Sequence, residues 1–318
     1  MSVSEKGSNW LANSFSVVGF CLLAVATFFG HFYLSLGALS GSILWSALTV
    51  AVGLLLLYLL VVVKQKDTDL RRWHVVEGVL LGVYVIFAVL TVKGPLHFVS
   101  VLTAKTELQQ AGREDVSALQ RMMADYEQFE REAIDRTYMG LMGYLHCQSV
   151  SPEAEAWLGR MNIARSEESI ERFLDKTQRE PLLGKSYAGM KQTWDEQTRW
   201  LGGVVESWSL FRLPYFATEV NQTGEQMAKA LKELSESAQL PVMSLKGSRL
   251  DMDEANQVFQ PSTAEGQLAQ KLQTVHYGCV WGWIAWFVLH LLILLSYILT
   301  HRSDRVSIKF TPDSGTVL

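Results

Sequence analysis

Residues 11–63 read LANSFSVVGFCLLAVATFFGHFYLSLGALSGSILWSALTVAVGLLLLYLLVVV and contain no aspartate, glutamate, lysine or arginine. About 20 mainly apolar residues are needed to cross a hydrocarbon core of ~30 Å, and a helix satisfies every backbone polar group within the segment. The stretch is long enough for two such helices, which we place at residues 14–36 and 43–63. The chain is therefore predicted to be an integral membrane protein.

Two further apolar stretches lie outside this region, at residues 75–92 and 277–299. Glu77 is the single acidic residue of the third stretch, and the fourth contains no acidic residue, lysine or arginine. The sequence Ala24-Val25-Ala26 resembles a signal-peptidase site. The apolar run continues beyond it, so we expect a first span that is retained. Four transmembrane helices follow.

The remaining charge is gathered between the third and fourth spans. The domains are predicted as residues 1–103 for a cytoplasmic N-terminus and three spans, 104–274 for a soluble domain, 275–300 for the last span and 301–318 for a tail. Helical periodicity runs through the soluble segment. The predicted fold is an all-α membrane protein of four transmembrane helices with a large extracytoplasmic helical bundle inserted between the third and fourth.

Basic residues indicate which side each loop occupies, because lysine and arginine favour the cytoplasmic side. They concentrate in the linker after the second span and in the tail, as Lys64, Lys66, Arg71, Arg72, Arg302, Arg305 and Lys309. Both termini are then cytoplasmic and residues 104–274 lie outside. Of three cysteines only Cys147 is in that domain, so it has no internal disulfide, which favours a bacterial inner membrane with a periplasmic domain.

Within the soluble segment, spacing of apolar residues predicts one long helix at 114–147, with further helices starting after the N-cap residues Ser151 and Ser166. An apolar face from Trp194 to Phe211 is interpreted as bundle core, with a ligand pocket or a membrane-touching surface as the alternatives. Residues 242–261 are predicted to be a loop with a short helix near 252–258.

The two connections to the membrane are expected to differ. A capping box at residues 262–265 begins a helix that we predict to continue unbroken into the fourth span. Gly94 and Pro95 follow the third span directly and form a candidate hinge, because proline removes a backbone donor and permits a kink.

Polar residues inside the spans are the sharpest candidates for function, because ionisable groups are costly in hydrocarbon. The candidates are His31, Glu77, Lys93 and His290. One reading is a proton or ion path, and the other is ordinary packing with hydrogen bonds between helices. Two pairs of small residues are candidates for close helix packing, namely Gly78 with Gly82 and Gly278 with Gly282.

The layout of a short outer loop, a short inner loop and a large helical outer loop before the last span resembles that of the tetraspanins. The resemblance concerns topology alone. Their Cys-Cys-Gly motif and paired disulfides are absent from this sequence, so the resemblance assigns no residue a role.

No phosphate-binding, zinc-protease, nucleophile-elbow or dinucleotide motif occurs in the soluble segments. We therefore expect no enzyme, no cofactor, no metal and no nucleic-acid partner. The leading hypothesis is a non-catalytic membrane scaffold or subunit of a bacterial envelope complex, with the lipid bilayer, other membrane or periplasmic subunits, or a second copy of the chain as partners. The alternatives are a membrane sensor with a ligand-binding domain and an oligomeric proton-conducting channel.

Overall fold

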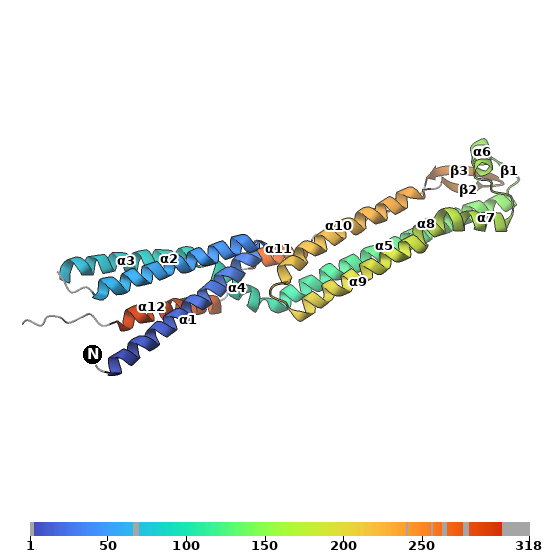
Figure 1. The fold of residues 1–318 in the computed structure, drawn as a ribbon. Coiled ribbons are helices and arrows are strands. Elements are labelled where there is room, and N and C mark those ends of the chain that lie inside the picture. Colours follow the sequence, from blue (N-terminus) through green and yellow to red (C-terminus); the bar gives the residue numbers. More distant parts are fainter. Residues whose placement is uncertain are drawn as a thin grey trace, which may run out of the picture. The chain divides into compact units, whose positions relative to one another are not determined.

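The computed structural model describes residues 3–65, 70–239, 241–255, 257–262, 266–275 and 280–300. The chain divides into two compact units. Unit 1 comprises Met1–Thr106 and Lys271–Leu318, and unit 2 comprises Glu107–Gln270. Figure 1 shows the elements of both units in chain order.

Unit 1 consists of helices among its described residues. They are α1 (Val3–Leu34), α2 (Leu39–Gln65), α3 (Leu70–Thr91), α4 (Lys93–Thr103), the last turn of α11 and α12 (Val280–Leu299). Four of them contain segments that are long and apolar enough to cross a membrane: Leu11–Leu34, Leu39–Gln65, Trp73–Thr91 and Val280–Leu299. The prediction of four candidate spans is confirmed, with boundaries that differ from the predicted ones by a few residues.

Helix α1 is the centre of unit 1, because α2, α4 and α12 all pack against it. Phe20 and Leu23 of α1 meet Leu60 of α2 and Ile293 of α12 in the core. Ser16 fixes the pairing with α12, since its hydroxyl donates to the Ile293 carbonyl at 2.9 Å and accepts from the Ser296 amide at 3.2 Å. The part of α1 around Ser16 therefore lies beside the last two turns of α12.

Helix α3 is the least buried of the four apolar helices. Between Val75 and Leu90 its exposed large side chains are all apolar: Val75, Val76, Val79, Leu81, Val83, Val85, Ile86, Val89 and Leu90. An all-apolar exposed surface of this kind is compatible with contact to the hydrocarbon of a bilayer.

Unit 2 is built on long helices. They are α5 (Lys105–His146), α9 (Lys185–Ser207) and α10 (Leu213–Ser237), with the shorter α6 (Pro152–Arg160), α7 (Glu167–Leu174), α8 (Glu180–Leu183) and α11 (Gln267–Thr274), and a π-helix η1 (Asp175–Arg179). The predicted N-caps are correct, because the hydroxyls of Ser151 and Ser166 accept from Ala154 and Ser169 amides. The long helix starts nine residues before the predicted position 114, at Lys105.

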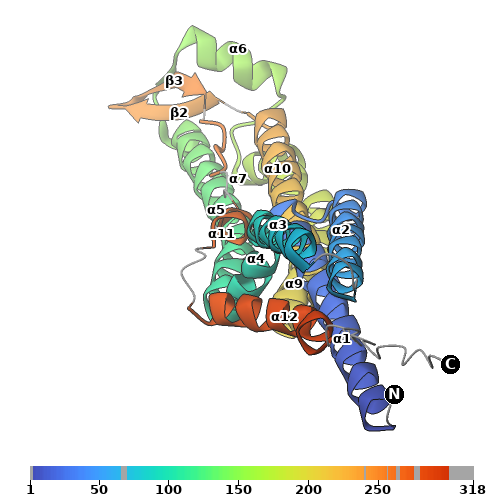
Figure 2. The same cartoon turned by 90° about the vertical axis from the view of Figure 1, so that its left-hand side faces the viewer.

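A small sheet corrects the prediction of an all-α fold. Strands β1 (Ser149–Val150), β2 (Pro241–Lys246) and β3 (Arg249–Ala255) are ordered β1-β3-β2, with β1 parallel and β2 antiparallel to β3. The predicted short helix near 252–258 is wrong, since β3 occupies its first half. A tight turn with Gly247 at φ +65° joins β2 to β3, and the sheet lies beside α6 (Figure 2).

The sheet and the short helices close over one end of α5. Met243 of β2 and Leu250 of β3 are buried with Leu141 of α5, Trp157 of α6 and Phe173 of α7. Burial of this apolar side of the hairpin explains why residues 241–255 form strands rather than a loop.

The predicted unbroken helix into the fourth span is also wrong. Helix α11 begins at Gln267 and ends at Thr274, and Val275 is not helical. Residues 263–265 of the proposed capping box lie outside the described residues. The hinge candidates Gly94 and Pro95 are both buried in the first turn of α4, where the missing amide of proline costs no helical hydrogen bond. Their role as a hinge stays a prediction.

Candidate functional site

The candidate Glu77 belongs to a polar cluster at the end of unit 1 where α2 and α12 finish. Its carboxylate accepts a hydrogen bond of 2.5 Å from the Tyr297 hydroxyl, and His74 lies 3.9 Å away. The Lys64 ammonium lies over the Tyr297 ring and donates to the carbonyl oxygens of Tyr297 and Ile298. Lys64 thereby places a positive charge at the C-terminal end of α12, where it also interacts favourably with the helix dipole.

The candidate His290 of α12 lies in a second polar group. This group is formed with α3, the helix that also carries Glu77. Its Nδ1 is 2.9 Å from the Tyr84 hydroxyl, and the ring packs edge-on against Trp286 with 4.8 Å between ring centroids. Among the described residues, His290 Nε2 and Trp286 Nε1 have no hydrogen-bond partner. The imidazole therefore uses one nitrogen and keeps the other available to a proton donor or acceptor.

These two groups are successive contacts between α3 and α12. Glu77 and Tyr84 are two helical turns apart on α3, and so are His290 and Tyr297 on α12, which runs the other way. Two turns correspond to about 11 Å along a helix. The pair Glu77–Tyr297 and the pair Tyr84–His290 thus form two polar contacts in line, each made by one tyrosine and one titratable side chain.

The candidates His31 and Lys93 lie at the other end of unit 1. The His31 ring stacks on Trp45, with 5.6 Å between ring centroids. Gly30 of α1 and Gly94 of α4 let the two helices approach closely, because a β-carbon on Gly30 would overlap the Gly94 carbonyl. Sequence reasoning missed Gly30, although a lone glycine beside a histidine in an apolar helix is a recognisable signal.

Sequence reasoning also missed His97, which is fully buried on α4. Burial lowers its pKa to about 4, and the charges of Lys93 and His31 add to this lowering. A hydrogen bond with the Leu272 backbone favours the charged form and acts in the opposite direction. His97 is thus neutral at physiological pH. His31, Lys93 and His97 are close enough to influence one another electrostatically and form a basic cluster at this end.

The predicted glycine pairs behave differently from one another. A β-carbon on Gly78 or Gly82 would meet nothing within 4 Å, so neither glycine packs against another described part of this chain. Gly282 faces α4, where an added β-carbon would lie 3.2 Å from Leu96. Gly278 lies outside the described residues. Close packing of Gly78 and Gly82 against another subunit stays a prediction.

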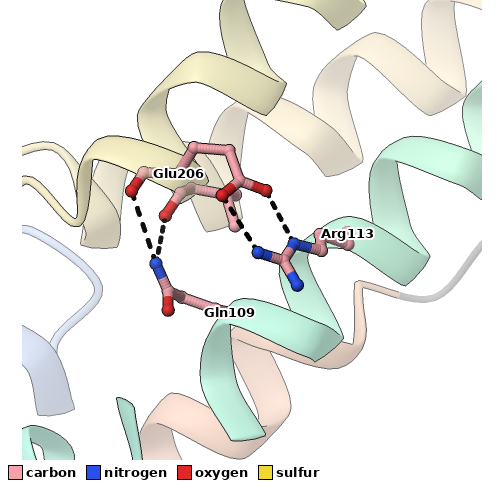
Figure 3. Close-up of polar contacts among 4 residues, drawn as sticks. Gln109, Arg113 and Glu206 are labelled. Carbon is pink, nitrogen blue, oxygen red and sulfur yellow. Dashed lines mark hydrogen bonds and ion pairs between the residues drawn. The ribbon is translucent and has the colours of Figure 1, made fainter. Parts of the chain in front are cut away.

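In unit 2, a group of polar side chains joins the first turns of α5 to the last turn of α9 (Figure 3). The Arg113 guanidinium donates to both carboxylate oxygens of Glu206 at 2.7 and 2.9 Å, and the Gln109 amide donates to the Val205 and Glu206 carbonyls. The ion pair is exposed and contributes little stability, but its two-pronged geometry sets the register of the helices.

Helix α11 is held at its start by two side chains from other helices. Both oxygens of the buried Asp115 carboxylate accept hydrogen bonds of 2.9 Å, from the amides of Gln267 and Leu268. Asn221 of α10 accepts from the Gly266 amide at 3.1 Å. Side chains from α5 and α10 thus hold the start of α11, and the described Gly266 is not helical, so the helix starts later than the capping-box prediction placed it.

Unit 2 has an open concave site of about 600 Å³ on the surface of α5 and the segment that contains the π-helix. Its lining combines two arginines, three acids and a small apolar floor: Arg131, Arg179, Asp135, Asp175, Glu180, Ile134, Leu183 and Gly184. The arginines pair with nearby acids, Arg179 with Asp175 and Arg131 with Glu127. The site therefore presents nearly balanced charge.

A buried carboxylate lies on the same helix. Glu130 is almost fully buried, and burial raises its pKa, while a hydrogen bond with Ser235 and the charge of Arg136 act in the opposite direction. Ser235 also accepts from the Phe259 amide at 2.9 Å. Within the part of the chain that the structure describes, Glu130 Oε1 has no hydrogen-bond partner.

The aromatic face predicted between Trp194 and Phe211 divides into two parts. Trp194, Leu201, Val204 and Val205 are buried, as the bundle-core interpretation predicts. Helix α9 then ends because Trp208 adopts a left-handed conformation with φ +48°. Phe211 beyond it is 57% exposed, so the core interpretation is wrong for this residue.

Comparison with protein-family models, with curated proteins and with solved structures finds no match to this chain. The function must therefore be argued from the two units themselves.

Proposed function

We propose that the chain is a non-catalytic integral membrane scaffold or subunit of a bacterial envelope complex, in which unit 2 is extracytoplasmic and docks partner proteins. The loop after α2 and the tail after α12 are rich in lysine and arginine, which favours a cytoplasmic position for both. Ser16 on α1 contacts Ile293 near the end of α12, and this pairing is consistent with a first and a last span that cross the bilayer in opposite directions.

An exposed apolar surface at the sheet end of unit 2 carries the docking proposal. Met139 of α5 is 70% exposed and Leu245 of β2 is 45% exposed. They lie next to the contact in which β2 packs against Gly140 and Gly143 of α5. Apolar side chains presented over a packed core are the usual centre of a protein interface.

The position of this surface along α5 also suits docking. Met139 is about 40 Å from Arg113 along the helix, by the rise of 1.5 Å per residue. The chain enters unit 2 at Glu107, near Arg113, so the docking surface is at the opposite end of α5 from the start of the unit.

Photo-crosslinking in native membranes tests this proposal. A photoreactive amino acid at Met139 or Leu245 is expected to give discrete heavier products that contain a second protein, whereas the same group at the exposed Lys229 of α10 gives none. Extraction in mild detergent should then recover the chain with that protein. A chain that is recovered alone and monomeric, with equal labelling at all three positions, sinks the proposal.

Proton conduction is a second candidate function, favoured by the two aligned contacts between α3 and α12. Glu77 and His290 can each exchange a proton, and each is hydrogen-bonded to a tyrosine hydroxyl. About 11 Å separates the contacts along the helices, so water has to connect them.

Liposomes that contain the purified chain and a trapped pH-sensitive dye distinguish conduction from packing. If the contacts conduct, E77Q and H290Q abolish proton flux while the chain stays folded and inserted, and H74Q retains it. Flux equal to that of empty liposomes for the unmodified chain eliminates conduction by the chain alone.

A further inference from the structure

The turn between α9 and α10 carries an exposed group of aromatic residues. We define the aromatic loop as residues 208–212 together with Tyr215 in the first turn of α10. Phe211 is 57% exposed and Tyr215 is 43% exposed, with the exposed Arg212 between them and Trp208 half-buried. Aromatic rings of this size are normally placed where they are removed from water.

The exposure is imposed by the packing around the loop. Leu213 and Phe216 alternate with Arg212 and Tyr215, and both are buried in the core of unit 2. The left-handed conformation of Trp208 stops α9, and the Arg212 and Leu213 amides both bond to the Ser209 carbonyl. A turn anchored on both sides thus holds Phe211 and Tyr215 outward.

The aromatic loop is also at the end of unit 2 from which the chain continues to the membrane spans. Glu206, two residues before the loop, is bonded to Gln109 and Arg113 in the first turns of α5 (Figure 3). Asp115, two residues after Arg113 on α5, holds the start of α11. The first and last residues of unit 2 therefore both lie near this turn.

The connecting segments limit how far this end can be from the bilayer. On one side α5 follows α4 after the single residue Ala104, and α3 ends at Thr91. On the other side the chain passes from Gln270 to α12 at Val280, and a segment of that length reaches at most about 35 Å when fully extended. Both covalent connections of unit 2 to the spans therefore leave from the end that carries the aromatic loop.

We propose that the aromatic loop inserts Phe211 and Tyr215 into the headgroup region of the bilayer, with Arg212 at the lipid phosphates. Tryptophan and tyrosine concentrate at this depth because their rings are apolar and their edges polar, and arginine pairs with phosphate. Unit 2 then has a third attachment to the membrane besides its two covalent connections, and the direction of α9 and α10 relative to the bilayer is fixed.

Lipid quenching in the full-length chain tests the insertion. Cys21, Cys147 and Cys279 are replaced by alanine, and an environment-sensitive fluorophore is attached to F211C, Y215C or the control K229C on α10. Each protein is reconstituted in vesicles of phosphatidylcholine and phosphatidylglycerol, with or without lipids that carry a nitroxide near the headgroup. The labels at 211 and 215 are expected to shift to the blue and lose about half of their fluorescence, and the label at 229 to keep both properties.

Two results overturn the proposal. In the first, labels at 211 and 215 behave like the label at 229, so the loop is in water. In the second, they shift to the blue without lipid quenching, so protein covers the loop instead. If F211C does not fold, Y215C and R212C have the same two outcomes. The test does not depend on a partner at Met139, so docking and insertion can fail separately.

Discussion

Asp115 is the residue on which the start of α11 depends. Its carboxylate accepts from two amides at the start of this helix, and it is itself almost fully buried. An aspartate that accepts from the first amides of a helix is also favourably placed in the field of the helix dipole. Removing it leaves two amide donors without this acceptor, and the Leu268 amide is buried.

We expect D115A to destabilise unit 2 by about 2 kcal/mol, the upper range for loss of a helix cap. In hydrogen exchange followed by mass spectrometry, protection should fall first in peptides that contain Gln267 and Leu268. E132A, which removes an exposed carboxylate from the same helix, serves as the control and should leave both protection and Tm unchanged. Undiminished protection of α11 in D115A would contradict the assigned role.

Glu130 predicts an unusual dependence of stability on pH. Because burial raises the pKa of this carboxyl in the folded chain, folding favours the protonated form. Its contribution to stability is therefore fully present below the unfolded pKa of about 4.3 and is lost as pH rises through the higher folded pKa. The E130Q variant, which keeps the shape without the charge, should melt a few degrees higher than the unmodified chain near pH 7.

The pH dependence of that difference is the decisive measurement. Thermal unfolding by circular dichroism in one detergent should show the gain of E130Q at neutral pH and its disappearance at pH about 4. E127Q is a useful contrast, because Lys191, Tyr187 and Arg131 lower the pKa of Glu127 despite its partial burial. E127Q should lose stability at neutral pH. If the difference in Tm between E130Q and the unmodified chain is the same at every pH in this range, the pKa of Glu130 is not raised by burial.

At the scale of elements, the four apolar helices could be predicted because each meets its length and composition requirement alone. The strands could not be found in the same way. Residues 241–255 are polar and irregular, and their apolar side becomes visible only when Met243 and Leu250 are set against α5 and α7. The Gly247–Ser248 dipeptide between them was nevertheless a recognisable turn signal.

The polar contacts in unit 1 also combine residues that the sequence reveals with residues that only the packing reveals. His290 and Glu77 were identified because ionisable residues are conspicuous in an apolar segment. Their partners Tyr84 and Tyr297 were not, because a tyrosine in a span is unremarkable until the pairing of α3 with α12 is known. Likewise Gly94 suggested a hinge, whereas its contact with Gly30 depends on how α4 packs on α1.

The contact of α5 with β2 predicts a strong effect of one methyl group. A β-carbon on Gly140 would overlap the Met243 carbonyl, a backbone atom that can move only with the strand. G140A should therefore cost about 2–3 kcal/mol and loosen the hairpin. G189A is the matched control, since a β-carbon there meets nothing within 4 Å and alanine improves an exposed helix by up to about 1 kcal/mol.

Thermal unfolding and limited proteolysis together measure this effect. G140A is expected to melt earlier and to be cleaved within residues 241–255 at protease concentrations that leave G189A intact. Equal Tm and equal cleavage for the two variants would mean that the hairpin does not rest on α5.

At the scale of the whole molecule, the structure describes two units that the chain joins twice, and the side of the membrane that unit 2 occupies determines which partners it can meet. The proposed placement of unit 2 outside depends on lysine and arginine near the ends of the spans, because short loops rich in these residues stay in the cytoplasm. The exposed polar residues of unit 2 give no independent indication, since acidic charge contributes little to this bias.

Labelling of single cysteines in intact cells decides the orientation, in a chain whose own Cys21, Cys147 and Cys279 are replaced by alanine. K229C on α10 and Q65C at the end of α2 are both exposed, so neither substitution disturbs a core. A membrane-impermeant maleimide should label K229C in intact cells, and Q65C only after the membrane is opened. The reverse pattern would place unit 2 in the cytoplasm, and its docking surface at Met139 and Leu245 would then have to serve cytoplasmic partners.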